Sequence, residues 1–119
     1  MDNIDTDKKL ALVQKLLEEK KAEDVEVIDL RDRTPIADYF VICSGTSNPH
    51  IKSIIDALTI DAKQQGLKKD HVEGQPGGGW FLVDYGDIVV HVFSPEERDY
   101  YDIESLWQKT AVKLEGASQ

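Results

Sequence analysis

The stretch WFLVDYGDIVVHVF, residues 80–93, is the most apolar part of the chain and decides its fold. Gly86 and Asp87 stand at its centre and have the composition of a two-residue hairpin turn. With that turn, Tyr85 lies opposite Ile88, and the pairing continues outward to both ends of the stretch. We therefore predict two antiparallel strands whose side chains alternate between two faces.

One face of this hairpin is suited to the protein core. Its only polar group is the phenol hydroxyl of Tyr85, and its members are Phe81, Val83, Tyr85, Ile88, Val90 and Val92. Apolar surface of this size is stable when other apolar groups remove it from water. We therefore expect other elements of the fold to pack against this face.

The opposite face combines apolar and ionisable side chains. Its members are Trp80, Leu82, Asp84, Val89, His91 and Phe93. A large aromatic residue among aliphatic and a few polar ones is typical of a protein-binding surface. The alternative is a face covered by a helix, with Asp84 and His91 hydrogen-bonded beneath it. The pattern of the strand leaves both interpretations open.

Hydrophobic periodicity predicts the remaining elements. The run DYFVICS is apolar without alternation, which is typical of a central strand covered on both faces. We expect, in chain order, a helix over residues 6–21, strands over 25–30 and 38–44, a helix from Asn48 as N-cap to a stop at Gly66, a short strand over 71–73, and a last helix that begins at Pro95 and carries RDYYDIESLW. This order predicts an α/β fold, a single domain over residues 1–119 with a mixed five-stranded sheet packed with helices, and residues 109–119 as a frayed tail.

Two loops have compositions that allow either a structural or a functional role. SGTS, residues 44–47, precedes a helix and could hold an anion on its backbone N–H groups. It lacks the Gly-Lys-Ser/Thr of a phosphate-binding loop, and no pair of carboxylates with metal-binding spacing follows it before the hairpin. We therefore interpret it as a turn and helix cap. The loop GQPGGG, residues 74–79, is expected to be a mobile connector or the rim of a binding surface.

The charge of the chain favours some partners over others. The formal net charge is −9, and the 14 Lys and Arg residues are spread along the sequence. An acidic protein is repelled by phosphate backbones and attracted by basic proteins. We therefore expect a basic protein partner rather than direct sequence-specific binding of nucleic acid. The alternative is that the charge serves solubility alone.

Metal, redox and membrane sites are not expected. The chain has one cysteine, Cys43, in an apolar run, and the three histidines share no ligand-like spacing with it. No cofactor, metal ion or catalytic residue is therefore predicted. No apolar run reaches the roughly 18 residues that span a bilayer, and the polar, acidic N-terminus has no signal-peptide pattern. These features indicate a cytoplasmic protein.

Several segments together resemble a known family, the ribosomal silencing factor S or Iojap family. They are ADYFVICSGTSNPHIKSIIDAL, the glycine-rich approach to Trp80, WFLVDYGDIVVHVF and ERDYYDIESLW, and the resemblance runs from about residue 5 to residue 108. The combination of DYGDIVVH with YYDIESLW is specific to it. One departure is Pro49, where the family often has arginine or another polar residue.

The resemblance implies a function and a partner. Members are bacterial cytoplasmic factors that bind the large ribosomal subunit through its universal protein fourteen, block joining of the small subunit, and lower translation when nutrients are short. A role in large-subunit maturation is also associated with the family. Its fold is similar to nucleotidyltransferases, but its members are not known as enzymes. The resemblance favours the binding interpretation of the second hairpin face, with Trp80 as its anchor. An enzyme on a nucleotidyltransferase-like scaffold and a homodimeric interaction module remain the alternatives.

Overall fold

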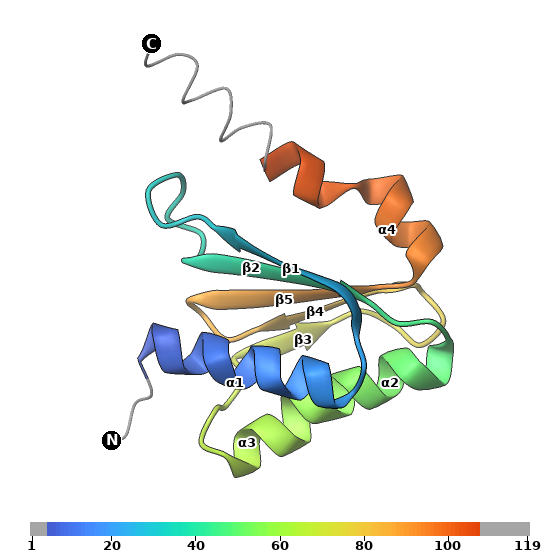
Figure 1. Cartoon of the computed structure of the whole chain (residues 1–119), viewed down its shortest axis with the longest axis horizontal. Coiled ribbons are helices and arrows are strands. Elements are labelled where there is room, and N and C mark those ends of the chain that lie inside the picture. The colour runs from blue at the N-terminus through green and yellow to red at the C-terminus, as the bar shows by residue number, and fades with distance from the viewer. Residues whose placement is uncertain (1–4, 108–119) are drawn as a thin grey trace.

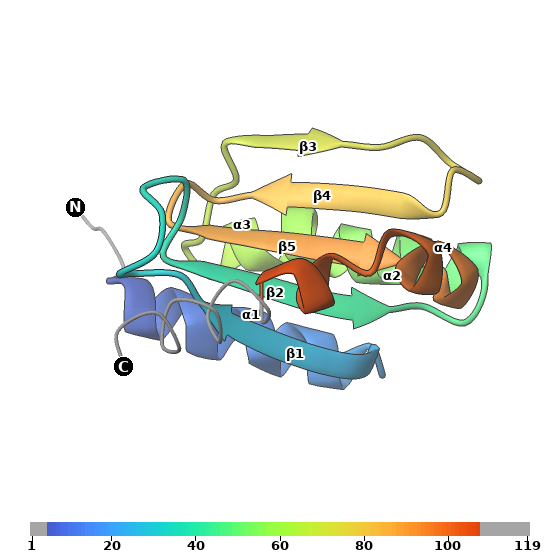
Figure 2. The ribbon, with the colours of Figure 1, turned by 90° about the horizontal axis from the view of Figure 1, so that it is seen from above.

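The structure, a computed structural model, describes residues 5–107 and places helices on both faces of one sheet (Figure 1). On one face lie α1 (Thr6–Glu19) and a continuous helical segment made of α2 (Asn48–Asp56), a π-helical turn η1 (Ala57–Asp61) and α3 (Ala62–Gln64). On the other face, within the described residues, lie α4 (Pro95–Tyr101) and the helical residues 103–107 that follow it (Figure 2). The two faces are therefore covered to different extents.

The sheet is mixed and has five strands, as predicted. In spatial order they are β1 (Glu23–Asp29), β2 (Tyr39–Ser44), β5 (Ile88–Phe93), β4 (Trp80–Asp84) and β3 (His71–Glu73). β2 and β5 pair in parallel, and every other neighbouring pair is antiparallel. Both central strands are buried along their whole length, which explains why neither DYFVICS nor IVVHVF alternates in polarity.

The predicted hairpin register is confirmed. Trp80 lies opposite Phe93, and Leu82 lies opposite His91. The amide of Tyr85 donates to the carbonyl of Ile88 over 2.9 Å, which closes the turn at Gly86 and Asp87. Gly86 has a φ of +95°, a conformation that favours glycine at this position.

The face predicted to be the core side is confirmed as such. The buried side chains of this face pack against α1 and the α2 segment, in one cluster with Val13, Leu17, Ile54 and Leu58. Cys43 belongs to the same cluster and is buried. Burial raises the pKa of its thiol to about 12, so it has the environment of a packed apolar residue rather than of a nucleophile.

The start of α2 differs by one residue from the prediction. Ser47, not Asn48, is the N-cap, and its hydroxyl accepts a hydrogen bond from the amide of His50 over 3.2 Å. Asn48 is the first helical residue, and Pro49 lies in the first turn, where its missing N–H is tolerated. The correction is local and leaves the face of the helix unchanged.

The helical segment after β2 contains a π turn that the periodicity did not predict. Such a turn adds a residue to the helix and leaves backbone groups without their usual partners. Here the hydroxyl of Tyr85 donates to the carbonyl of Leu58 over 2.5 Å, in a buried position. Tyr85 therefore supplies a donor from the core face of the hairpin, and the hydroxyl of Thr59 within the turn donates to the carbonyl of Ile55 over 2.9 Å.

The N-terminal part of α1 is tied to the hairpin turn through Asp87. Its carboxylate accepts from the hydroxyl of Thr6 over 2.5 Å and from the ammonium of Lys9 over 3.1 Å. Partial burial opposes ionisation of Asp87, but these two donors outweigh it and hold its pKa below the usual range. α1 ends at Glu19 rather than at the predicted residue 21, and Lys21 has a φ of 60°.

The last predicted helix is interrupted. α4 begins at Pro95 as expected, with the Ser94 hydroxyl accepting from the amide of Glu97. Asp102 then adopts a left-handed conformation with a φ of 47°, and residues 103–107 form a second helical piece. The predicted tail over residues 109–119 lies outside the described residues.

Candidate protein-binding site

The second face of the hairpin is divided between covered and accessible side chains. The three members on β5, Val89, His91 and Phe93, are buried. The three members on β4, Trp80, Leu82 and Asp84, are half-buried. The prediction of six side chains on a shared surface therefore needs a correction, because the chain itself covers those on β5.

The cover comes from the C-terminal part of the described chain. Ile103 and Trp107 pack against a cluster that includes Phe93 and also Phe40 from β2. The rings of Phe40 and Trp107 meet edge to face, with centroids 5.5 Å apart. The helix-covered alternative thus holds for the β5 half of the face, and the β4 half is left as the candidate surface.

Trp80 connects the two halves. Its indole stacks on Phe93 at a centroid distance of 4.9 Å and contacts the ring of Tyr101 at 4.5 Å. Its Nε1–H donates to Nδ1 of His91 over 3.2 Å. The orientation of Trp80 is therefore set by a hydrogen bond and two ring contacts.

His91 is held neutral beneath this surface. It is 4% exposed, and burial lowers its pKa to about 4. Because Nδ1 accepts from Trp80, the ring proton resides on Nε2. Nε2 is buried and has no hydrogen-bond partner within residues 5–107, and the ring of Phe40 meets that of His91 edge to face at 4.7 Å. The role that this arrangement supports for His91 is orientation of Trp80.

The accessible half has members that sequence reasoning missed. Tyr101 is 45% exposed and reaches Trp80 from α4, and Tyr100 beside it is more exposed still. A hollow of about 310 Å³ lies beside Trp80 and is lined by Glu73, Gly74, Trp80 and Leu82. The paired tyrosines in RDYYDIESLW were the available signal. The contact of Tyr101 with Trp80 depends on how α4 packs, which the pattern of the strands does not reveal.

The SGTS loop satisfies its own polar groups, as a turn and cap should. The amide of Thr46 donates to Nδ1 of His50 over 2.9 Å, and the Ser47 hydroxyl caps the helix. Nε2 of His50 lies 2.7 Å from the carbonyl oxygen of Lys20 and fastens α2 to the end of α1. The amides of Gly45, Thr46 and His50 are thus already engaged within the protein.

Similarity to known proteins identifies the family of this chain. The family described as "Ribosomal silencing factor during starvation", RsfS, matches residues 3–119. The chain belongs to the RsfS family. The ribosomal silencing factor RsfS of Halalkalibacterium halodurans is 40% identical over 90% of this chain and 92% of its own length. That of Bacillus subtilis is also 40% identical, over 76% of each chain.

Relatives beyond bacteria and solved structures agree with RsfS membership. The mouse protein named mitochondrial assembly of ribosomal large subunit protein 1 is 33% identical over 89% of this chain and 48% of its own length. A crystal structure of a Chromobacterium violaceum protein superimposes with a TM-score of 0.84 at 34% identity and covers 88% of both chains. The RsfS relatives are named as silencing factors rather than as enzymes.

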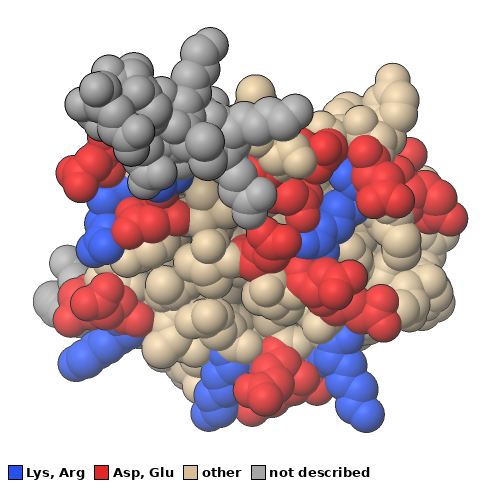
Figure 3. All heavy atoms as spheres, turned by 45° about the horizontal axis from the view of Figure 1, so that its top comes forward, with Lys and Arg blue, Asp and Glu red and all other residues tan. Residues whose placement is uncertain are grey.

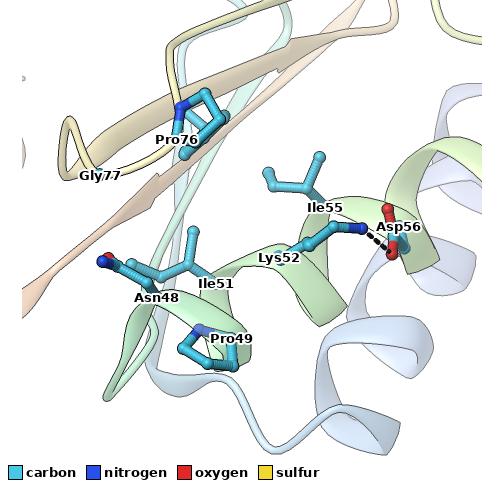
Figure 4. Close-up of a pocket in the computed structure, with 9 residues that line it drawn as sticks. Asn48, Pro49, Ile51, Lys52, Ile55, Asp56, Pro76 and Gly77 are labelled. Carbon is cyan, nitrogen blue, oxygen red and sulfur yellow. Dashed lines mark hydrogen bonds and ion pairs between the residues drawn. The ribbon is translucent and has the colours of Figure 1, made fainter.

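The RsfS fold also contains an apolar hollow away from the Trp80 surface (Figure 4). It measures about 500 Å³ and lies between α2 and the glycine-rich loop. Ile51, Ile55 and Phe81 line it from the folded core, and Pro76 and Gly77 face them from the loop. The loop predicted to be a connector or a rim therefore borders a cavity.

Within residues 5–107, His, Cys, Asp and Glu side chains form no group of three that would hold a metal ion. No helix in the same part of the chain is long and apolar enough to cross a lipid bilayer.

Proposed function

We propose that this chain is a translational repressor that binds the large ribosomal subunit through its universal protein fourteen. Bound there, it blocks joining of the small subunit and lowers translation under nutrient limitation in the bacterial cytoplasm. Membership of the RsfS family supports this proposal, together with the names of the bacterial relatives. It acts by occupying a surface, without a catalytic residue or cofactor.

The observation that carries the proposal is the half-open aromatic surface around Trp80. Trp80, Leu82 and Tyr101 combine exposed apolar area with fixed orientation, and Asp84 and Glu73 place carboxylates at the rim. Rigid aromatic side chains near the centre of an interface tend to supply most of its binding energy. The carboxylates and the net charge of −9 match a basic ribosomal protein.

Co-sedimentation with separated ribosomal subunits tests the proposal. The chain should pellet with the large subunit, stay in the supernatant with the small one, and reduce joining of the two. Leu82→Lys should weaken large-subunit binding by roughly tenfold or more, because it removes an apolar contact and sets a cation against a basic partner. Leu82 is preferred over Trp80, whose truncation would also disturb its buried neighbours Phe93 and His91.

Ile60→Ser is the matched control for this variant. Ile60 is an exposed apolar side chain on η1, on the opposite side of the sheet. Its substitution should leave binding to the large subunit unchanged. Equal losses for the two variants, or pelleting with the small subunit, would contradict the proposed surface.

A role in large-subunit maturation is the second candidate. It is favoured by the mouse relative, whose name refers to mitochondrial assembly of the ribosomal large subunit. In a strain without the gene, accumulation of large-subunit precursors at normal subunit-joining rates would favour maturation over repression. An enzymatic role would instead predict stabilisation by nucleotide and magnesium in a thermal shift assay, by about 2.7 kcal/mol at one hundred times the dissociation constant.

A further inference from the structure

A second surface lies on the other flank of α4, at the free edge of the sheet. β1 ends the strand order, and within the described residues it pairs only with β2. An edge strand presents unpaired backbone N–H and C=O groups, to which an extended segment of another chain can add as a new strand. β1 has a bulge between Glu23 and Glu26, and its regular ladder with β2 runs over Glu26–Asp29, whereas β3 at the opposite edge has three residues. β1 is therefore the longer template.

The side chains of β1 give this edge a defined chemistry. Its sequence EDVEVID holds carboxylates at both ends and between its valines. Val25 and Val27, two residues apart, are each 37% exposed. Val25 lies in a bulge of β1 and lines the cavity beside α4, whereas Val27 pairs with Val41 on the side of the sheet that α1 covers. Both valines therefore offer apolar contacts beside negative charge, on different sides of the edge.

A cavity of about 620 Å³ lies between β1 and α4 and adds to the negative charge. Asp24 and Glu26 line it from β1, and Asp99 and Glu104 line it from the α4 side. Figure 3 shows acidic side chains gathered on the face that carries these elements. The surface beside β1 is therefore predominantly acidic.

Among residues 5–107, Arg98 is the one cation in the cavity wall, and it is already engaged. Arg98 is 8% exposed, and its guanidinium lies 2.8 Å from Oε2 of Glu104 and donates to the Ser44 hydroxyl over 2.9 Å. The other carboxylate oxygen of Glu104, Oε1, is buried and has no hydrogen-bond partner within residues 5–107. The cavity wall therefore keeps one carboxylate oxygen, Oε1 of Glu104, that can accept a hydrogen bond beside the ion pair of Arg98 with Glu104.

We propose that the free edge of β1 and the cavity beside α4 bind an extended basic segment of a protein partner. The segment adds to β1 as a strand along Glu26–Asp29, sets an apolar side chain against Val27, and directs a lysine or arginine into the cavity toward Asp99 and Glu104. Opposite charges across neighbouring strands stabilise the pairing, whereas a second copy of β1 would set carboxylates against carboxylates. The same charges repel RNA. This surface is separate from the one around Trp80.

Nuclear magnetic resonance titration with a designed peptide tests the proposal on the full chain. The probe is a short capped peptide in which lysine alternates with valine, and a glutamate-valine peptide of the same length is its control. The lysine peptide should shift the amide signals of Glu23–Asp29 and of the residues around Asp99, increasingly so at lower salt. The glutamate peptide should leave these signals in place.

Two charge reversals sharpen the assignment. Asp99→Lys, at an exposed position on α4, should weaken lysine-peptide binding by about fivefold or more. Asp70→Lys makes the same change beside β3, at the other edge of the sheet, and should leave binding unchanged. Tyr101→Ser should also leave peptide binding unchanged while weakening ribosome binding, so the two surfaces are tested separately.

Three results would overturn the proposal. Peptide shifts centred on Trp80 and Leu82 would place the peptide on the other surface. Concentration-dependent shifts of β1 without peptide would assign the edge to a second copy of the chain. Equal binding of the lysine and glutamate peptides would show that the surface does not recognise the charge of the segment.

Discussion

The two faces of the sheet are built from the same hairpin and are closed in different ways. Under α1 and α2 the hairpin contributes aliphatic side chains to a cluster with Leu17, Ile54 and Leu58. Under α4 it contributes aromatic rings and His91, and the cover is a short helix and residues 103–107. The first face is closed by whole helices and serves stability. The second leaves Trp80 half-buried, so part of its apolar surface remains available to a partner.

The largest expected effect compares a deep truncation on the first face with one on the second. Ile54→Ala should lower the free energy of unfolding by about 2–5 kcal/mol, because it empties a fully buried position. Ile103→Ala, on the half-buried cover of the second face, should cost about 1–2 kcal/mol. Urea denaturation of both variants measures the difference. Equal costs would show that the two faces are packed alike.

Acid should act on the second face before the first. The pKa of His91 is lowered to about 4 by burial, against about 6.5 in the unfolded chain, so the unfolded state takes up the proton first. Stability from this group is complete above pH 6.5 and is lost as the pH falls toward 4, by at most about 3 kcal/mol.

Urea denaturation at pH 7 and pH 4.5 checks this prediction. His91→Gln, which keeps an acceptor for Trp80, should flatten the loss in this window. Asp87 has a lowered pKa, so its contribution is present above the pKa of the unfolded carboxyl and is lost only at more acidic pH. An unchanged pH profile in His91→Gln would mean that another group titrates.

A smaller effect is expected at the π turn of the first face. Tyr85→Phe removes the hydroxyl that donates to the carbonyl of Leu58 and leaves that buried acceptor without its donor. The expected cost is about 1–3 kcal/mol, with a fold that is otherwise intact. Thermal denaturation gives the cost, and amide exchange at residues 57–61 should quicken. A neutral variant would show that the π turn satisfies its own carbonyl.

The smallest effect concerns Cys43, which reports on closure of the first face. Burial raises the pKa of its thiol to about 12, so almost no thiolate is present at pH 8. Labelling with a thiol reagent should be very slow in the folded protein and fast in denaturant. Rapid labelling of the native chain would show that the first face opens readily.

The sequence predicted the features that depend on local pattern. The hairpin register follows from alternation around Gly86 and Asp87, and the core face follows from Phe81 to Val92. The features it missed depend on distant contacts. Tyr101 reaches Trp80 only because α4 folds back over β5, and the break at Asp102 needs a left-handed residue that the periodicity of RDYYDIESLW does not reveal. The burial of Val89 and His91 likewise depends on contacts with segments that are distant in the sequence.

The parallel pairing of β2 with β5 has a consequence for synthesis of the chain. β5 lies at the centre of the sheet but is its last strand in the sequence, and its pairing joins Tyr39 to Ile88 across the intervening helices and strands. A chain emerging residue by residue from its own ribosome can therefore form α1, α2 and the β1–β2 pair early. The sheet closes only after Phe93 has left the exit tunnel. Until then one edge of the apolar strand β2 is open, and the sheet lacks its central strand.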